Sequence, residues 1–261
     1  CINGSAPMIE LLLKAGADPN TTLPEGETAL MTAARTGKLD AVKSLLSHGA
    51  DINFKESRRG QTALMWAAAE GNAQVVAELI ERGADLHAKT KGGFTPLLFA
   101  VREGRIGAMQ AMLKAGANVN ESWQGGRTTG VNGISAMVLA VANAHYELAS
   151  VMLDAGADPN ASVQGWTALH QITWVRKPGK GDNDPAPEGS GEVSSLELVR
   201  KLAARGANVA VVDVDEVAGR EMVSKIEGGE SRFLFLRANV AQAEEVEQAV
   251  SKVVDRWKRL D

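Results

Sequence analysis

The sequence has one cysteine, one tyrosine and few aromatic residues, which make up 4% of its 261 positions. A single cysteine permits no internal disulfide, so cysteine usage does not indicate a redox compartment. No apolar run approaches the ~18 residues that a membrane-spanning helix needs. The chain has 28 Lys and Arg against 32 Asp and Glu, a net charge of −4. This balance argues against a sequence-independent nucleic-acid binder, and we expect neither nucleic acid nor a membrane as a partner.

Two further absences concern metals and targeting. Four histidines lie in separate parts of the chain without metal-ligand spacing: His48, His87, His145 and His170. We therefore expect no metal site. The chain begins at Cys1, without an initiator methionine, so we expect that it is trimmed at its start. The sequence leaves open whether a signal peptide precedes it, and a cytoplasmic location is only the default.

The chain does contain an internal repeat. The tag G-A-[DN] recurs with spacings of 33, 34, 33, 40 and 50 residues at Gly16, Gly49, Gly83, Gly116, Gly156 and Gly206. A second tag, [TS]-[AP]-[LM], follows the first five of these glycines at Thr28, Thr62, Thr95, Ser135 and Thr167. Two tags that keep step at about 33 residues are typical of a helical repeat protein.

Each tag has a physical role in a unit of two helices. The Thr or Ser of the second tag is typical of a helix N-cap, and Gly37, Gly71 and Gly104 are typical of the glycine that closes a helix. Second helices are predicted over 39–47 and 73–81, where apolar residues recur at steps of three and four. The polar, glycine-containing stretches before each Thr predict hairpin-like turns.

These repeats resemble ankyrin repeats. The matching blocks are G-E-T-A-L-M-T-A-A-R-T-G (26–37), G-Q-T-A-L-M-W-A-A-A-E-G (60–71) and G-F-T-P-L-L-F-A-V-R-E-G (93–104), together with the following G-A-D-[PI]-N blocks. The resemblance covers about residues 1–209, with a truncated first repeat and insertions at 122–132 and 177–194. It implies a mainly α fold, a solenoid of helix-turn-helix-hairpin repeats. Only His170 keeps the histidine usual after T-P-L, so we expect the hydrogen bonds of that histidine to be mostly absent.

The resemblance also implies that the protein binds other proteins through the hairpin tips and the concave face formed by the first helices. The tip positions that match are Glu27, Gln61, Phe94, Ile134 and Trp166. Candidates on the helix face are Arg35, Arg102 and Glu103, and Trp123 in the enlarged hairpin is a further candidate. Large apolar groups at exposed tips are typical of binding hot spots. The alternative is that each packs on its neighbouring hairpin.

Two other aromatic residues, Trp66 and Phe99, stand one position into the helix from the usual core sites. We predict that both lie in the core.

After Val209 the repeat pattern ends. The residues then predict a strand over 210–215, a helix over 216–226, a strand over 232–240 and a helix from 241 to about 260. The order strand, helix, strand, helix predicts a parallel α/β unit.

This end of the chain resembles short-chain dehydrogenases/reductases, from their second strand to the helix after their third. The matching residues are G-A-N-V-A-V-V-D-V-D-E-V-A-G (206–219), R-A-N-V (237–240) and R-W-K-R-L-D (256–261). The resemblance implies an incomplete Rossmann-like segment. It also implies that Asp213 matches the residue that bonds the adenosine ribose of NAD and that Asn239 matches one beside the adenine.

The family's chemistry needs a glycine-rich turn before the first helix, so that backbone amides can approach a pyrophosphate. Val193 and Ser195 stand where the last two glycines belong. The sequence also contains no N-N-A-G and no Y-x-x-x-K, whose Tyr and Lys perform the proton transfer. We therefore predict no catalytic residue, no enzyme activity and no bound cofactor, with Asp213 and Asn239 as vestiges of an NAD site.

The sequence thus predicts a chimeric fusion of an ankyrin-repeat domain, 1–209, with a partial dehydrogenase-like α/β segment, 210–261. Its predicted function is a non-enzymatic scaffold for an unidentified protein partner. One alternative is an NAD-binding fragment derived from an oxidoreductase. Another is that the tail only caps the open apolar end of the last repeat. The stretch 195–215 suits both patterns, because L-A-A-R-G-A-N-V can end an ankyrin repeat or lead into a dehydrogenase strand.

Overall fold

The structure is a computed structural model. It describes residues 5–124, 133–163, 167–175, 191–213, 215–217, 220, 233–239 and 242–257. The chain divides into two compact units, Cys1–Asn143 and Ala144–Asp261, which we call unit 1 and unit 2 and describe separately. The described residues are mainly helical with few strands, as the sequence predicts.

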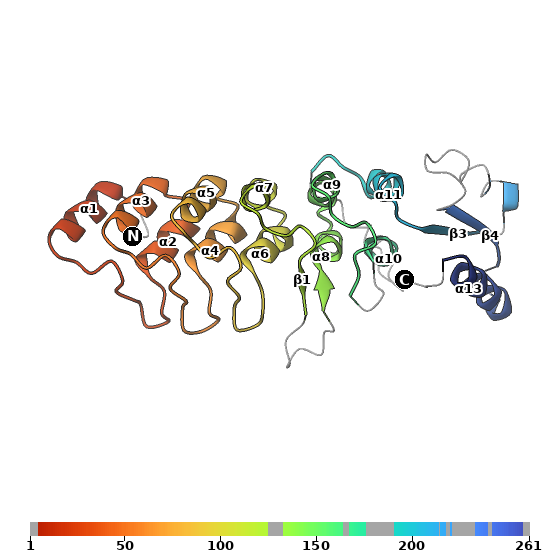
Figure 1. The fold of residues 1–261 in the computed structure, drawn as a ribbon, viewed down its shortest axis with the longest axis horizontal. Coiled ribbons are helices and arrows are strands. Elements are labelled where there is room, and N and C mark those ends of the chain that lie inside the picture. The colour runs from red at the N-terminus through yellow and green to blue at the C-terminus, as the bar shows by residue number, and fades with distance from the viewer. Residues whose placement is uncertain are drawn as a thin grey trace, which may run out of the picture. The chain divides into compact units, whose positions relative to one another are not determined.

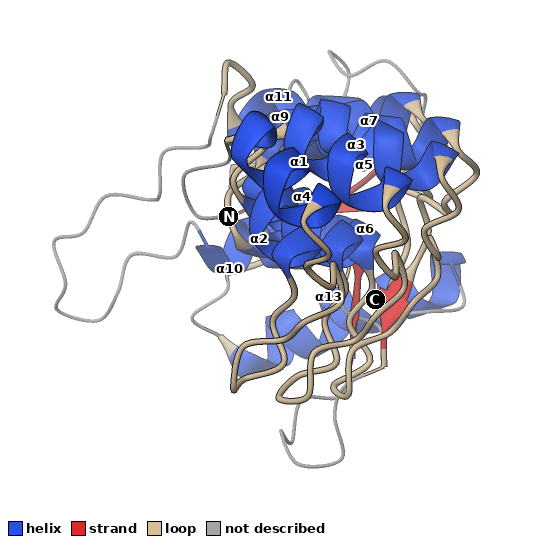
Figure 2. Ribbon diagram, turned by 90° about the vertical axis from the view of Figure 1, so that its left-hand side faces the viewer, coloured by secondary structure: helices blue, strands red, loops and turns tan. Residues whose placement is uncertain are grey.

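The helices of unit 1 form two layers, and the hairpins extend from one side of them (Figure 1, Figure 2). The first helices of the repeats form one layer: α2 (Ala29–Arg35), α4 (Ala63–Glu70), α6 (Pro96–Arg102) and α8 (Ala136–Ala142). The second helices form the other: α1 (Ala6–Lys14), α3 (Leu39–Ser47), α5 (Ala73–Glu81) and α7 (Ile106–Lys114). Each helix contacts its counterpart in the next repeat, which is the packing of a solenoid.

Local signals in the sequence account for these helix limits. The N-cap hydroxyls each accept a backbone amide three residues on, at 3.3 or 3.4 Å, at Thr28, Thr62, Thr95 and Ser135. These four predicted N-caps are confirmed. The predicted helix stops Gly37, Gly71 and Gly104 have φ of +70°, +79° and +68°, a conformation that glycine adopts without steric cost.

The core of unit 1 lies between the two helix layers. In the second full repeat, Leu64 and Met65 of α4 and Leu79 of α5 are at most 1% exposed. Phe99 is 6% exposed, as predicted. The prediction is wrong for Trp66, which is only half-buried, because a pocket opens beside its ring.

In unit 1, Asn20 and Asn53 each tie one repeat to the next. Asn20 donates from Nδ2 to the Gly49 carbonyl at 3.0 Å and accepts the Asp51 amide at 2.7 Å. One repeat later, Asn53 makes the same two bonds, to Gly83 at 3.3 Å and from Asp85 at 2.8 Å. The asparagine of each G-A-D-[PI]-N block therefore holds the closing turn of the following repeat.

Unit 2 combines helices with a two-stranded parallel sheet. Its named elements are α9 (Tyr146–Asp154), α10 (Ala168–Val175), α11 (Ser195–Ala204), β3 (Val209–Asp213), β4 (Phe233–Arg237) and α13 (Ala243–Trp257). The strands pair in parallel, with Val209 opposite Phe233 and Asp213 opposite Arg237, as predicted from the element order. The described apolar cluster beside this sheet consists of Leu236, Ala238, Ala249 and Val253. Most of the predicted helix 216–226 and of the insertion 177–194 lies outside the described residues.

Helix α11 is held as the second helix of an ankyrin repeat. Asn160 donates to the Gly206 carbonyl at 3.1 Å, which is the bond that Asn20 and Asn53 make in unit 1. Lys201 of α11 and Arg205, which caps its C-terminal end, both bind the Asp154 carboxylate of α9, at 2.5 and 2.6 Å. The same helix leads directly into β3, so it also occupies the place of the helix that precedes a dehydrogenase strand.

Candidate functional site

The hairpins of unit 1 are closed by backbone bonds at the predicted tip positions. The carbonyls of Glu27, Gln61 and Phe94 accept the amides of Leu23, Glu56 and Thr90 at 2.9, 3.0 and 2.9 Å. In the fourth hairpin, β1 (Ser122–Trp123) pairs in antiparallel with β2 (Ile134–Ser135), and Trp123 lies opposite Ile134. Five of the predicted partner-binding residues therefore stand at hairpin closures.

Neighbouring hairpins are also bonded to one another. Ser57 donates from Oγ to the Glu25 carbonyl at 3.0 Å, and the Lys91 amide donates to the Arg59 carbonyl at 2.8 Å. The indole nitrogen of Trp123 donates to the Gly92 carbonyl at 2.7 Å. These bonds hold successive hairpins in register, and the tips form one continuous surface that we call the hairpin row.

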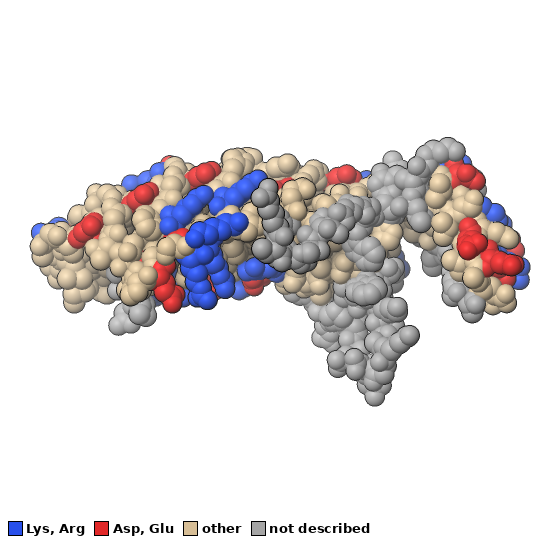
Figure 3. All heavy atoms as spheres, turned by 90° about the horizontal axis from the view of Figure 1, so that it is seen from below, with Lys and Arg blue, Asp and Glu red and all other residues tan. Residues whose placement is uncertain are grey.

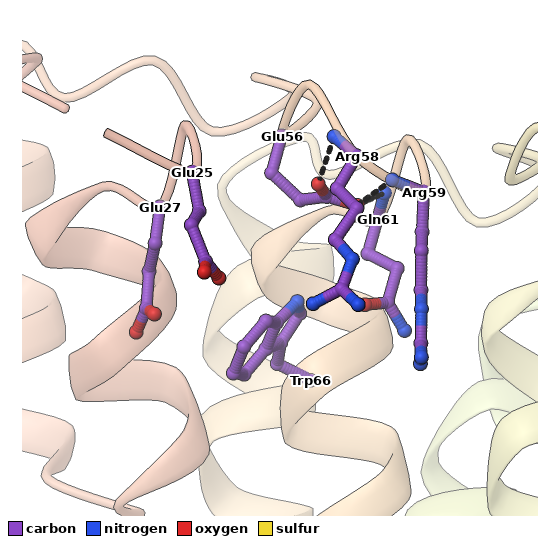
Figure 4. Close-up of a pocket in the computed structure, with 7 residues that line it drawn as sticks. All are labelled: Glu25, Glu27, Glu56, Arg58, Arg59, Gln61 and Trp66. Carbon is purple, nitrogen blue, oxygen red and sulfur yellow. Dashed lines mark hydrogen bonds between the residues drawn. The ribbon is translucent and has the colours of Figure 1, made fainter. Parts of the chain in front are cut away.

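A pocket of about 180 Å³ opens in the hairpin row between the first two of these hairpins. It is lined by Glu25, Glu27, Glu56, Arg58, Arg59, Gln61 and Trp66, and we call it the Trp66 pocket. Figure 4 shows Glu25 and Glu27 on one side, Arg58, Arg59 and Gln61 on the other, and the Trp66 indole between them. The pocket therefore has an acidic wall and a basic wall.

Glu56 shapes the basic wall from within its own hairpin. Its side chain is 6% exposed and accepts the backbone amides of Arg58, Arg59 and Gln61 at 2.5, 2.7 and 3.0 Å. Burial alone would raise the pKa of Glu56, but these amide bonds and the nearby Lys91 ammonium hold it below its ordinary value. Glu56 is thus a structural anion that fixes the turn from which Arg58 and Arg59 project.

The acidic wall contacts the indole through an arginine. Glu27 accepts the Thr32 hydroxyl at 2.7 Å and lies 3.5 Å from Arg35. The Arg35 guanidinium in turn lies 4.8 Å from the centroid of the Trp66 ring, which is cation–π geometry. Two predicted residues, Glu27 and Arg35, therefore hold one face of Trp66.

Lys and Arg side chains gather on the hairpin side of unit 1 (Figure 3). The ammonium groups of Lys55 and Lys91 donate to the carbonyls of Lys89 and Ser57. In the described residues no hydrogen bond or ion pair engages the guanidinium groups of Arg58 and Arg59. Unpaired exposed cations at hairpin tips are available to an anionic partner.

A second group in the hairpin row is aromatic. Phe94 makes edge contacts with Phe99 and Trp123, at centroid distances of 5.2 and 5.8 Å. The Arg102 guanidinium lies 5.4 and 5.0 Å from the Phe94 and Phe99 rings, and its Nε is 2.7 Å from Glu103. Phe94 thus packs on its neighbours and remains half-buried. Of the other predicted apolar tips, Ile134 is half-buried in β2, and Trp166 lies outside the described residues.

Sequence reasoning missed the Trp66 pocket itself. It placed Glu27, Gln61 and Arg35 at the correct tip and helix positions but assigned Trp66 to the core. A signal was present, because the equivalent position in the preceding repeat is the polar Thr32. A polar residue at the equivalent position of another repeat indicates that a side chain at this position can border a polar environment.

The N-terminus of α11 is the place where a dinucleotide pyrophosphate would have to bind. There Ser194 and Glu197 form a capping box: Ser194 Oγ accepts the Glu197 amide at 3.2 Å, and Glu197 accepts the Ser194 amide at 2.7 Å. Hydrogen bonds from the Ser194 amide and hydroxyl lower the pKa of Glu197. A carboxylate therefore occupies the end of the helix that would attract phosphate, so these residues do not fit the cofactor.

The two residues predicted to be vestiges of an NAD site lie on or beside the strands. Asp213 ends β3, and its side chain is outside the description. Asn239 follows β4, and its backbone amide donates to Glu245 Oε2 at 2.8 Å.

In the part of the chain that the structure describes, no group of three or more His, Cys, Asp and Glu side chains has an arrangement that could hold a metal ion. Of the helices described, none is long and apolar enough to cross a membrane.

Two protein-family models match the chain, and they match different regions. The model described as ankyrin repeats (3 copies) matches residues 1–90 and 54–122, and the model described as short chain dehydrogenase matches residues 194–261. The N-terminal region therefore carries ankyrin repeats, and the C-terminal region carries a short-chain dehydrogenase segment. Both predicted resemblances are confirmed, and the two matched regions do not overlap.

Individual proteins resemble one region or the other. The crystal structure of the human ASB11 ankyrin repeat domain has a TM-score of 0.63 and 22% identity, over 79% of this chain and 81% of that one. An uncharacterized oxidoreductase of Thermotoga maritima is 39% identical over 75 residues, and the short chain dehydrogenase/reductase astE of Aspergillus oryzae is 34% identical over 74. The chain spans about 28% of the length of these two relatives. The dehydrogenase segment is therefore partial.

Proposed function

We propose that the protein is a non-enzymatic scaffold that binds a partner protein through the hairpin row and the adjoining first-helix face. The observation that carries this proposal is the hairpin row itself, in which hydrogen bonds to backbone carbonyls join four hairpins into one surface. That surface presents the guanidinium groups of Arg58 and Arg59, which have no partner in the part of the chain that the structure describes. It also presents the half-buried Phe94 and Trp123. Arginine and aromatic groups on a rigid support are the residues that dominate protein interfaces.

The proposal that the chain is not an enzyme rests on α11. The capping box of Ser194 and Glu197 satisfies the helix N-terminus with the chain's own groups. A pyrophosphate at this end would have to displace a carboxylate and would gain no glycine-supported approach, because Val193 and Ser195 both carry side chains. The dehydrogenase-derived residues therefore serve as structure. No observation on the site favours NAD binding.

The experiment selects ligands for the full chain from a displayed library of cellular protein fragments and maps each by hydrogen exchange. We expect protection at the four hairpins. The triple variant Phe94→Ser, Ile134→Ser, Trp166→Ser should weaken binding at least about tenfold, since hot-spot side chains contribute about 2 kcal/mol or more each. Circular dichroism should show that the variant still folds. Protection confined to other surfaces, or unchanged affinity, would contradict the proposal.

A calorimetric titration with NAD tests the rival function. We expect no saturable heat with the full chain. Saturable binding that disappears in Asp213→Ala would instead support an NAD-binding, oxidoreductase-derived protein.

A further inference from the structure

We infer that the Trp66 pocket receives a peptide amide group from an acidic, extended segment of the partner. This inference rests on the proposed function and specifies its ligand chemistry. It is carried by the opposed polarity of the pocket walls, by the Trp66 indole nitrogen, and by the cations of the adjacent hairpin tips.

The indole nitrogen of Trp66 is a hydrogen-bond donor without an acceptor. Its Nε1 is buried and has no hydrogen-bond partner in the described residues. Indole N–H can only donate, and buried donors are normally satisfied. The unsatisfied group lies in the lining of a pocket, so an oxygen acceptor supplied by a ligand would complete it.

The opposite wall supplies acceptors. The Glu25 carboxylate makes no hydrogen bond or ion pair in the described residues, although its backbone carbonyl accepts from Ser57. Glu25 and Arg58 line the same pocket without an ion pair within 4.0 Å. Each wall therefore keeps its hydrogen-bonding capacity for a third group placed between them.

A peptide amide matches this arrangement because it presents both kinds of group. Its N–H can donate to the carboxylate wall while its carbonyl accepts from the indole nitrogen. A phosphate would meet the Glu25, Glu27 and Glu56 carboxylates at close range, and like charges disfavour each other. A cationic side chain would leave the indole N–H unsatisfied. The amide is the group that satisfies both walls.

Arg58 controls access to the indole nitrogen. Figure 4 shows its guanidinium beside that nitrogen, and no hydrogen bond or ion pair in the described residues holds the guanidinium in place. It can therefore swing outward when a ligand enters and then pair with a ligand carboxylate. Glu56 keeps the Arg58 backbone fixed during this movement, because it accepts the Arg58 amide.

The flanking surface selects acidic side chains. Within the described residues the guanidinium groups of Arg58 and Arg59 have no partner. Lys91 from the next hairpin lies against the same turn through its bonds to Ser57 and Arg59. Residues on either side of the bound amide would lie over these cations. Carboxylates there would gain charge complementarity and a faster, salt-dependent encounter.

The experiment uses the full chain and a displayed library of random 12-residue peptides. Peptides selected on the wild type are synthesised with a fluorescein label, and affinity is measured by anisotropy at several salt concentrations. We expect enrichment in Asp and Glu. Arg58→Gln/Arg59→Gln should weaken binding about tenfold or more and flatten the salt dependence. Trp66→Phe should weaken it about five- to tenfold, the effect of one lost hydrogen bond, and should leave the salt dependence unchanged.

The indole signals provide a direct readout. The chain has five tryptophans, and Trp66→Phe assigns the Trp66 indole peak in a proton–nitrogen correlation spectrum by its loss. We expect this peak to move downfield when peptide binds. The charge-matched control is Lys38→Gln/Lys114→Gln, which removes two exposed cations outside the pocket and should bind as the wild type does.

Several outcomes would overturn the inference. The inference fails if no peptide binds, or if the selected peptides are not enriched in Asp and Glu. It fails if Trp66→Phe and Arg58→Gln/Arg59→Gln bind the peptides with wild-type affinity. It also fails if a 12-nucleotide RNA moves the Trp66 peak at a lower concentration than the peptides do. If the peptides bind the pocket variants with wild-type affinity but bind Phe94→Ser/Ile134→Ser more weakly, the scaffold function stands and the pocket inference fails. If Trp66→Phe lowers the melting temperature, Glu25→Gln tests the acidic wall separately, with a several-fold loss expected and wild-type affinity contradicting it.

Discussion

From α2 to α7 of unit 1, every full repeat contains fully buried leucine and methionine side chains, whereas the β3, β4 and α13 group of unit 2 has a small described core. That core consists of Leu236, Ala238, Ala249 and Val253. Between Thr28 and Lys114, unit 1 builds its core from three repeats that each have a threonine N-cap and a pair of helices. The strand group has two paired strands with one helix packed on β4.

The two cores differ because repeat arrays and parallel sheets depend differently on the number of their elements. A repeat contacts only its neighbours, so an array keeps its core when it is short. A parallel sheet needs several strands covered on both faces, and two strands alone make a marginal sheet. An ankyrin array therefore keeps a packed core when it has few repeats. A parallel sheet with few strands loses much of the apolar surface that it would bury.

The largest expected effect comes from emptying each core in turn. Leu79→Ala, at a position 0% exposed, should lower the free energy of unfolding of unit 1 by about 2–5 kcal/mol, through lost burial and the cavity left behind. Leu236→Ala, at a position 7% exposed, should reduce hydrogen-exchange protection only across 233–257. Denaturant titration and exchange mass spectrometry measure both. If Leu236→Ala lowered the free energy of the main unfolding transition as much as Leu79→Ala does, the two cores would not differ as described.

An intermediate effect tests whether the asparagine bond that stabilises the repeats of unit 1 also stabilises the turn after α11. Asn53→Ala and Asn160→Ala each remove an inter-repeat bond, to Gly83 and to Gly206, and each should cost about 1 kcal/mol. Thermal unfolding measures the loss. Asn208→Ala is the control, because no side-chain hydrogen bond of Asn208 is found in the described residues. A loss at Asn53 without one at Asn160 would mean that α11 is held as dehydrogenase structure instead.

The smallest effect is a pH dependence in unit 1. Burial raises the pKa of Glu121 above its ordinary value of 4.5, although the Thr95 hydroxyl donates to it at 2.7 Å. Folding therefore favours the protonated carboxyl, and stability is lost as pH rises through the folded pKa. Glu121→Gln, which keeps an acceptor for Thr95, should raise the melting temperature at pH 7 and leave it unchanged at pH 3. A gain at both pH values would show that charge is not the cause.

Much of the fold could be predicted because its signals are local. The helices predicted over 39–47 and 73–81 have the limits of α3 and α5. Thr28 and Thr62 act as N-caps within three residues of the amides they accept. The candidate site was harder to predict. Glu27 was placed at a hairpin tip, but its contact with the Arg35 that covers Trp66 depends on the packing of two adjacent repeats.

Short-range signals were enough to predict the repeat architecture, because caps, helix stops and apolar spacing act over a few residues. The matching sequence blocks were enough to predict the family of each region. Only the tertiary structure decided the Trp66 pocket, since its walls come from different hairpins and its indole from α4. It also decided how the ambiguous stretch 195–215 is used. The bond from Asn160 to Gly206 spans 46 residues, and such a contact has no local signal, because it forms only when α11 packs on α9.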